Sequence, residues 1–387
     1  MRKTVVVALC ALCFGLGACK KNESPKAAAP DTPAALKIGL VTDVGGRGDQ
    51  SFNDGALRGL ETWAAGKRYS PQGYQRLAPE ELQASVPEDI RAEHPIKPVG
   101  VEPVVLQAKQ QEDYEPNLQL LVDDGVRLAI GVGFMLENAV ELAAKKNPDA
   151  RFLLIDSPIL DASGAPHELP NVRTITFREE EGAFLVGALA GLVTKTNRVG
   201  FVGGMQIPLI RRFETGFRAG VATTNPEAAK TLLVGYTGSF DKVEAGKQVA
   251  QDMISKDADV LFHAAGADGL GAIAAAREAG KWAIGCDSDQ HHVAPETILT
   301  SMIKRVDLAV FLAASEAAAG RFEAGHADLG LKEGGLGYAP LRSEMLADKE
   351  ALVARLESLR KAVVEGSIKV PATLEALASF QPPAPAE

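Results

Sequence analysis

The stretch LAIGVGFMLENAVELAAKKNPDARFLLID, residues 128–156, contains the pattern that decides the fold. Two short apolar runs, 128–132 and 152–155, flank a segment whose apolar side chains recur at helical spacing. A buried strand, an amphipathic helix and a second buried strand in that order form the repeating unit of a parallel sheet. The second strand ends at Asp156, and in open α/β sheets ligands bind beyond the carboxyl ends of the strands.

The same alternation continues on both sides of this unit. It predicts an α/β fold with two Rossmann-like lobes, each built on a parallel doubly wound sheet and joined by a hinge with several crossings. The strands are expected at 35–42, 101–106, 128–132, 152–155, 174–177, 199–202, 231–236, 260–263, 282–286 and 297–302.

The domain limits follow from this pattern. We expect an N-terminal lobe from 36–158 plus about 290–325, a C-terminal lobe from 159–289 plus about 335–372, and a disordered tail over 373–387. Residues 68–98 hold five prolines and much charge where a connection is usually only a few residues long, so they form a surface insertion without an assigned function.

The first nineteen residues predict export. Arg2 and Lys3 precede an apolar run over 5–14, which is too short to span a bilayer and is typical of a signal peptide. The ending Leu-Gly-Ala-Cys resembles the lipobox of bacterial lipoproteins, so we expect lipidation of Cys19 and a flexible tether over 20–35. The protein is then anchored through its lipid to the periplasmic face of the inner or outer membrane. Lys20, the residue after Cys19, is compatible with either membrane.

Composition excludes several classes of partner. A net charge of −9 argues against nucleic acid, because phosphate binding needs a basic surface. Cys286 is the one cysteine left beyond Cys19, so the folded part has no internal disulfide. The histidines lack the spacing of a metal site, and no dinucleotide or P-loop motif is complete, so we expect no metal and no cofactor.

The residues that follow the predicted strands suit a nucleoside. Phe52 and Phe240 offer two aromatic faces for a base, and stacking of a base contributes about 1–3 kcal/mol. Asp287 and Lys304 offer an acceptor and a donor for ribose hydroxyls. Further candidate ligand-binding residues in the same crevice are Asp43, Asn53, Gly133, Asp156 and Gly266.

Several longer motifs carry a resemblance to a known family. They are DVG…DQSFN (43–53), GVGF (131–134), NPD (147–149), FREEEGAFLVG (177–187), GGM…PLIRRFETGF (203–217), GSFD (238–241), CDSDQ (286–290) and MIKRVD (302–307). The chain resembles the basic membrane protein (Bmp, PnrA-like) family of nucleoside-binding lipoproteins from 36 to about 372, apart from the insertion. Two departures are Gln206, where family members often carry Asp, and the loop Gly-Ala-Asp-Gly over 266–269.

This resemblance implies a type I periplasmic-binding-protein fold and a set of roles. The base would lie between Phe52 and Phe240, the ribose would contact Gly266, Asp287 and Lys304, and Asp43 and Asn53 would line the same pocket.

The function expected from both arguments is the receptor of an ABC-type importer. It would be a monomer and no enzyme, would bind a nucleoside, with a purine favoured, and would deliver it to a permease in the inner membrane. The alternatives are a receptor of the same fold for a sugar or signalling molecule, and a nucleoside-processing enzyme, which the lack of a recognisable nucleophile and base disfavours.

Overall fold

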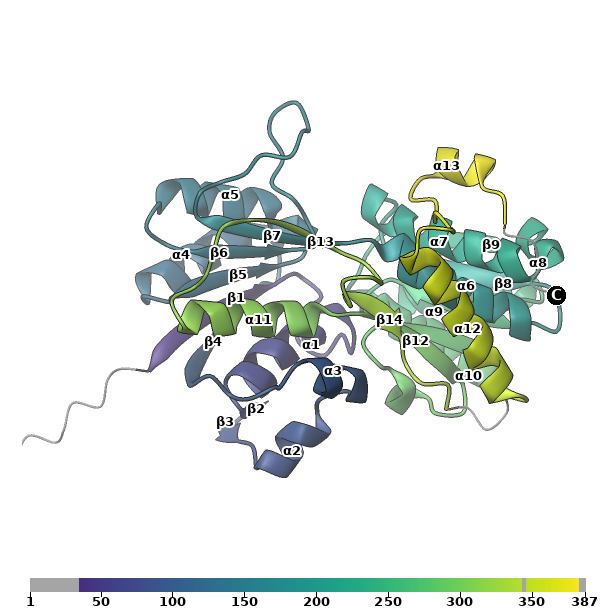
Figure 1. Cartoon of the computed structure of the whole chain (residues 1–387), viewed down its shortest axis with the longest axis horizontal. Helices are drawn as coiled ribbons and strands as arrows, with labels where there is room; N and C mark the ends of the chain where they lie inside the picture. Colours follow the sequence, from purple (N-terminus) through teal and green to yellow (C-terminus); the bar gives the residue numbers. More distant parts are fainter. Residues whose placement is uncertain (1–34, 343–345, 383–387) are drawn as a thin grey trace, which may run out of the picture. The chain divides into compact units, whose positions relative to one another are not determined.

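The computed structural model describes residues 35–342 and 346–382, and within these it contains two six-stranded sheets (Figure 1). The predicted lipobox, signal peptide and tether up to residue 34 lie outside the described residues. In the described part, no helix is both long and apolar enough to cross a bilayer.

The first sheet has the order β13-β7-β6-β5-β1-β4, and its pairs are all parallel. Its strands are β1 (Leu36–Thr42), β4 (Val101–Gln107), β5 (Leu128–Val132), β6 (Phe152–Ile155), β7 (Val172–Phe177) and β13 (Gly325–Leu329). Helices cover both faces: α1 (Phe52–Leu57), the π-helical turn η1 (Arg58–Ala64) and α11 (Val306–Ala318) on one, α4 (Tyr114–Asp123) and α5 (Glu137–Lys146) on the other.

Strand β6 shows why the strands of this sheet have continuously apolar sequences. Phe152 and Leu154 point into the core beneath α4 and α5, whereas Leu153 and Ile155 point into the core beneath η1 and α11. All four are fully buried, because a parallel sheet is covered on both faces.

The second sheet has the order β14-β12-β11-β10-β8-β9. Its strands are β8 (Val199–Gly203), β9 (Leu233–Tyr236), β10 (Val260–Ala264), β11 (Trp282–Asp287), β12 (Ile298–Lys304) and β14 (Leu336–Tyr338). Its helices are α6 (Glu179–Val193), α7 (Pro208–Thr224), α8 (Pro226–Lys230), α9 (Val243–Ser255), α10 (Asp268–Glu278), α12 (Lys349–Val364) and α13 (Leu374–Ser379). The predicted two-lobed, doubly wound α/β fold is therefore confirmed, except that β14 runs antiparallel to β12.

The chain passes between the sheets three times, from β7 to α6, from β12 to α11 and from β13 to β14. In Figure 1, the green α11 lies beside the purple α1 of the first lobe, although the two helices are far apart in the sequence. The predicted hinge with several crossings is thus present.

The predicted lobe limits were wrong in two places. Strand β7 pairs with β6 and so belongs to the first sheet, which therefore extends to residue 177 and not 158. Strand β12 pairs with β11 in the second sheet, although 290–325 was assigned wholly to the first lobe. Both strands end at a crossing, where sequence alone shows a strand but not its neighbour.

The predicted insertion is ordered. Residues 67–98, called the insertion below, form the hairpin β2 (Lys67–Ser70) and β3 (Gly73–Arg76), then α2 (Pro79–Ala84) and α3 (Glu88–Glu93). These elements lie together beside α1 in Figure 1. The tail over 373–387, expected to be disordered, contains the helix α13 (Leu374–Ser379), which Thr373 caps by accepting a hydrogen bond from Ala376 N.

Candidate ligand-binding site

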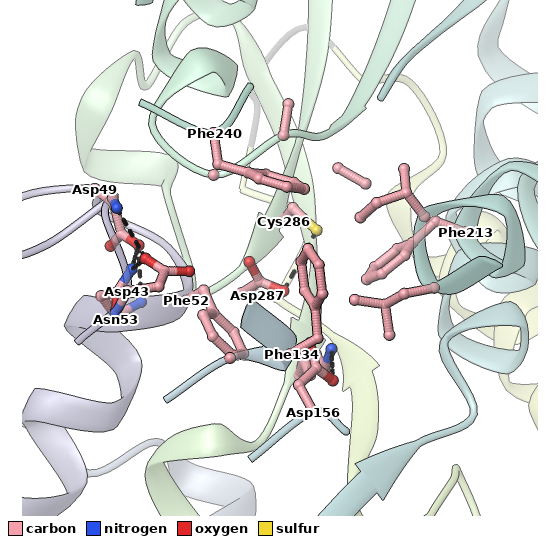
Figure 2. A pocket seen from close by; sticks show the side chains of 18 residues that line it. Asp43, Asp49, Phe52, Asn53, Phe134, Asp156, Phe213, Phe240, Cys286 and Asp287 are labelled. Carbon is pink, nitrogen blue, oxygen red and sulfur yellow. Dashed lines mark hydrogen bonds and ion pairs between the residues drawn. The ribbon is translucent and has the colours of Figure 1, made fainter. Parts of the chain in front are cut away.

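A cavity of about 540 Å³, including the space at its open mouth, lies at the carboxyl ends of the strands of both sheets (Figure 2). The nine candidate residues predicted from the sequence all line it: Asp43, Phe52, Asn53, Gly133, Asp156, Phe240, Gly266, Asp287 and Lys304.

On one side of the cavity, Asn53 holds two buried aspartates together, as the dashed lines in Figure 2 show. Its Nδ2 donates to Asp43 Oδ1 at 2.7 Å and to Asp49 Oδ2 at 3.0 Å, and its Oδ1 accepts from the Asp43 backbone N–H at 3.3 Å. The amide of Asn53 is therefore committed to the protein, and this residue orients Asp43 for the cavity.

Burial governs the charge of these two aspartates. It raises the pKa of Asp43 to about 6, although hydrogen bonds from Asn53 and Gly45 oppose the shift. It also raises the pKa of Asp49 to about 7, against hydrogen bonds from the backbone of Ser51, Asn53 and Asp54. Both carboxyls thus titrate near neutral pH, because no cation among the described residues forms an ion pair with either of them.

Asp43 turns one oxygen to the cavity. Its Oδ1 accepts from Asn53 and from the Gly45 N–H at 2.8 Å, and in the described part of the chain no hydrogen bond reaches Oδ2. A Cβ at Gly133 would lie 3.1 Å from this Oδ2, and Gly133 has φ +106°, so a side chain there would be strained and would crowd Asp43. A free acceptor therefore faces the ligand space.

Across the cavity, Lys304 is surrounded by carboxylates. Its Nζ lies 2.5 Å from Asp156 Oδ1 and 2.9 Å from Glu179 Oε1, and all three side chains are almost completely buried. Burial alone would lower the pKa of Lys304, but the charges of Asp156, Glu179 and Asp287 raise it above its ordinary value. Lys304 is therefore a fixed cation at neutral pH.

Asp287 joins the two sides of the cavity. Its Oδ2 accepts a hydrogen bond of 2.5 Å from Ser51 Oγ, which belongs to the first lobe, whereas Asp287 ends a strand of the second. Burial raises the pKa of Asp287, and Lys304 and Ser51 counteract this effect. Asp287 and Asp156 both adopt a left-handed backbone, with φ 63° and 74°. Such strain at the ends of two strands is frequent at ligand sites.

Aromatic side chains line the space between the charged groups. Phe52 and Phe240 were predicted, and the structure adds Phe134 and Phe213. The Phe134 and Phe240 rings meet edge to face with centroids 6.2 Å apart. Lys304 Nζ lies 5.4 Å from the Phe52 ring centroid and 5.5 Å from that of Phe213, so the cation also contacts the faces of rings.

Sequence reasoning missed Asp49, Phe134, Phe213 and Glu179. Asp49 and Phe134 stand in loops that had been identified as strand ends, and Glu179 follows β7 in the Phe-Arg-Glu-Glu-Glu motif, so the strand-end rule could have found these three. Phe213 lies within α7, and only the packing of that helix brings it to the cavity. Among the described residues, no cluster of three or more His, Cys, Asp or Glu is arranged to hold a metal ion.

The fold and the cavity define a class of protein: two α/β lobes with a polar cleft at the strand ends are the architecture of a solute-binding protein. A structure of an ABC transporter solute-binding protein from Aeropyrum pernix is similar over 89% of this chain and 96% of its own, with a TM-score of 0.68 and 29% identity. A solute-binding protein from Conexibacter woesei has the same fold, with a TM-score of 0.62 and 22% identity over 87% of this chain and 99% of its own.

Sequence similarity shows which family the chain belongs to. Residues 36–373 match the Bmp family, described as ABC transporter substrate-binding protein PnrA-like, and the chain belongs to this family. Relatives include the CD4+ T-cell-stimulating antigen of Listeria innocua, 34% identical over 92% of this chain and 94% of the relative. The ABC transporter nucleoside-binding protein BmpA of Lactococcus lactis is 32% identical over 87% and 89%. The protein is thus a substrate-binding component of an ABC transporter and not an enzyme.

Proposed function

We propose that this protein binds a nucleoside, with a purine nucleoside favoured, and presents it to the permease of an ABC-type importer. The observation that carries the proposal is the arrangement of Asp287 and Lys304 beside Phe52 and Phe240, with the free oxygen of Asp43 in the same cavity. The printed name of the Lactococcus lactis relative supports it, because that protein is a nucleoside-binding one.

The sugar end of the ligand would meet the charged side of the cavity. Asp287 accepts and Lys304 donates to two neighbouring ribose hydroxyls, and such charge-assisted hydrogen bonds are roughly twice as strong as neutral ones. Gly266 has φ 54° and a Cβ there would lie 3.1 Å from the Phe240 carbonyl oxygen, so glycine keeps the backbone of this loop close to the cavity. Asp156 keeps the Lys304 ammonium in position.

The base end would meet Asp43 and the rings. Asp43 Oδ2 accepts from an N–H group on the edge of the base, Phe52 and Phe240 stack on its faces, and Gly133 leaves room beside Asp43. A base that offers N–H donors at this edge is bound best when Asp43 is ionised.

Closure of the lobes would follow from contacts that only the closed form makes. Ser51 Oγ reaches Asp287 and Ser288 Oγ donates to the Ser51 carbonyl oxygen at 2.9 Å, so both hydrogen bonds join the first lobe to the second. Bound ligand adds contacts to both sides and shifts the population toward this form.

Lipidation of Cys19 would keep the receptor at the membrane, where the permease is. A monomer tethered by the residues after Cys19 meets its permease at a raised effective concentration. Mass spectrometry of the mature N-terminus tests this part: a diacylated or triacylated Cys19 is expected, and an unmodified N-terminus elsewhere contradicts it.

Calorimetry tests the ligand class. Adenosine, guanosine, inosine, uridine and free ribose are titrated into protein that has been unfolded and refolded to remove bound ligand. Tight binding of at least one nucleoside with far weaker binding of ribose is expected. Equal affinity for ribose contradicts the stacking mode and favours a sugar receptor, whereas binding of none of the five contradicts the nucleoside proposal.

A further inference from the structure

The insertion has no part in the binding mode proposed above, yet it contacts two segments that carry the ligand-binding residues. One is the loop 43–53 after β1, called the pocket loop below, which bears Asp43, Phe52 and Asn53. The other is the crossing from β12 to α11, which begins at Lys304.

The first contact runs through Arg47, in the middle of the pocket loop. Its guanidinium makes two hydrogen bonds to Glu61, of 2.9 and 2.7 Å, and lies 4.0 Å from the centroid of the Tyr69 ring. Tyr74 donates its hydroxyl hydrogen to the same Glu61. Tyr69 and Tyr74 are opposite residues of the β2–β3 hairpin, and their rings meet edge to face at 5.5 Å. The hairpin therefore contacts Arg47 directly through Tyr69 and indirectly through Tyr74, which bonds to the partner of Arg47.

The second contact runs through Arg305, the residue after Lys304. Its guanidinium forms an ion pair with Asp89 on α3, and its backbone N–H donates to the Gly335 carbonyl oxygen at 2.9 Å. Gly335 belongs to the third crossing, between β13 and β14. Arg305 thus joins the insertion to the hinge directly beside the cation of the binding site.

A buried base makes the insertion stiff enough to transmit these contacts. Leu82, Val86, Ile90 and Ile96 are buried in the core that contains η1 and α11, and Trp63 Nε1 donates to Ser85 Oγ at 3.2 Å. A surface loop attached only at its ends would hold neither Tyr69 nor Asp89 in a fixed place.

The alternative is that these are ordinary surface ion pairs, which contribute little. Arg47 and Glu61 are not a weak surface pair, because their side chains are only 24% and 5% exposed and are joined by two hydrogen bonds. Burial also argues against the alternative for Arg305, whose side chain is 10% exposed. Asp89 is largely exposed, so the second contact is the weaker of the two.

We propose that the insertion is a brace that orders the pocket loop and the β12–α11 crossing before ligand arrives, with Tyr69, Tyr74 and Asp89 as positioning residues. The effect on affinity rests on the nucleoside proposal, whereas the ordering itself does not. Preorganised loops bind ligand more tightly, because the entropic cost of ordering them does not reduce the free energy of binding.

Amide hydrogen exchange on the ligand-free protein tests the ordering without any nucleoside. In a variant with both Tyr69→Ala and Tyr74→Phe, exchange over 43–53 is expected to rise about tenfold, the effect of losing roughly one charged hydrogen bond. Asp89→Asn is expected to raise exchange over 304–308 by about threefold, as loss of a partly exposed ion pair does.

Matched controls separate ordering from general loss of stability. Arg76→Ala lies in the same hairpin and Glu88→Gln next to Asp89, and neither side chain has an ion pair or hydrogen bond among the described residues. Tyr69→Phe keeps the ring over Arg47 and should exchange like the parent. If the double variant and Asp89→Asn remain within about twofold of these controls, the brace does not exist.

Affinity is then measured by calorimetry with whichever of adenosine, guanosine, inosine or uridine the parent binds. The double variant is expected to bind about tenfold more weakly, and the two controls like the parent. Faster exchange with unchanged affinity contradicts the positioning role. If the parent binds no nucleoside, the function proposed above fails, and the exchange result alone decides whether the brace orders the loop.

Discussion

The two charged sides of the cavity stabilise their buried carboxyl groups in different ways. Around Asn53, two buried carboxyls are held by neutral donors, so burial raises the pKa of Asp43 to about 6 and that of Asp49 to about 7. Around Lys304, buried carboxylates share one ammonium, and the pKa of that ammonium rises. The Asn53 side has no cation among the described residues, whereas the Lys304 side keeps a permanent ammonium, although burial raises the pKa of Glu179 there to about 7. The predictions below test this difference.

The largest expected effect comes from removing the shared cation. Lys304→Ala leaves Asp156 buried without an ion-pair partner and Glu179 with Arg212 alone, 3.3 Å away. Loss of one member of a buried ion pair costs about 3–5 kcal/mol. Urea unfolding should show a fall of this size, and Lys242→Ala, on an exposed side chain, should show almost none. A loss below about 1 kcal/mol would mean that the carboxyls take up protons instead of remaining charged.

Ligand binding should depend on both sides together. Phe52→Ala removes a stacking face and Asp287→Ala a charged acceptor, so each is expected to weaken nucleoside binding at least tenfold with little loss of stability. Calorimetry measures this, with the exposed Asp149→Ala as control. Nearly unchanged affinity in both variants would disprove the assignment of the site.

The pH dependence of stability should follow Asp43. Its native pKa of about 6 lies above the ordinary 3.8, so the native state holds more protons in that range, and ionisation of Asp43 makes the protein less stable as pH rises from about 4 to 6. Asp43→Asn keeps the Oδ1 acceptor and removes the titration. The loss of unfolding free energy between pH 4.5 and 7.5 should then shrink by about 1–2 kcal/mol.

Urea unfolding at both pH values measures this difference, and Asp149→Asn is the control because its carboxyl is exposed. The same slope in Asp43→Asn and in the parent would show that Asp43 is not the titrating group. The part of the slope that belongs to Asp49 should persist in the variant.

The smallest expected effect concerns the hydrogen bond that joins the two lobes. Ser51→Ala removes the donor to Asp287 and leaves the backbone of the pocket loop unchanged, so nucleoside affinity should fall about three- to tenfold. The loss should appear mainly in a faster dissociation rate, which stopped-flow fluorescence can follow. A slower association rate with unchanged dissociation would show that Ser51 acts before closure.

The sequence predicted the cavity well because its residues obey one rule. Asp43, Gly133, Asp156, Gly266 and Asp287 each stand at or just beyond the carboxyl end of a strand, and strands can be recognised by their apolar runs. Phe213 could not be found in this way, because a helix brings it to the cavity.

Charge partners were harder to predict than positions. Lys304 was expected to donate to the ligand, but its contacts with Asp156 and Glu179 depend on how two crossings lie side by side. The lobe limits were wrong for the same reason, since strand neighbours are long-range contacts. Asn53 was expected to face the ligand, and only the hydrogen bonds show that its amide is occupied by Asp43 and Asp49.

The three crossings between the lobes also constrain the order in which the lobes can fold. The first sheet receives its edge strand β13 only when residue 329 has been made, and Trp63 meets Phe311 of α11 only after residue 318. Until then, β7 has an open edge and the apolar surface of η1 is uncovered. The N-terminal lobe therefore cannot finish folding before residue 329 has been made, by which point strands β8 to β12 of the second lobe are already present.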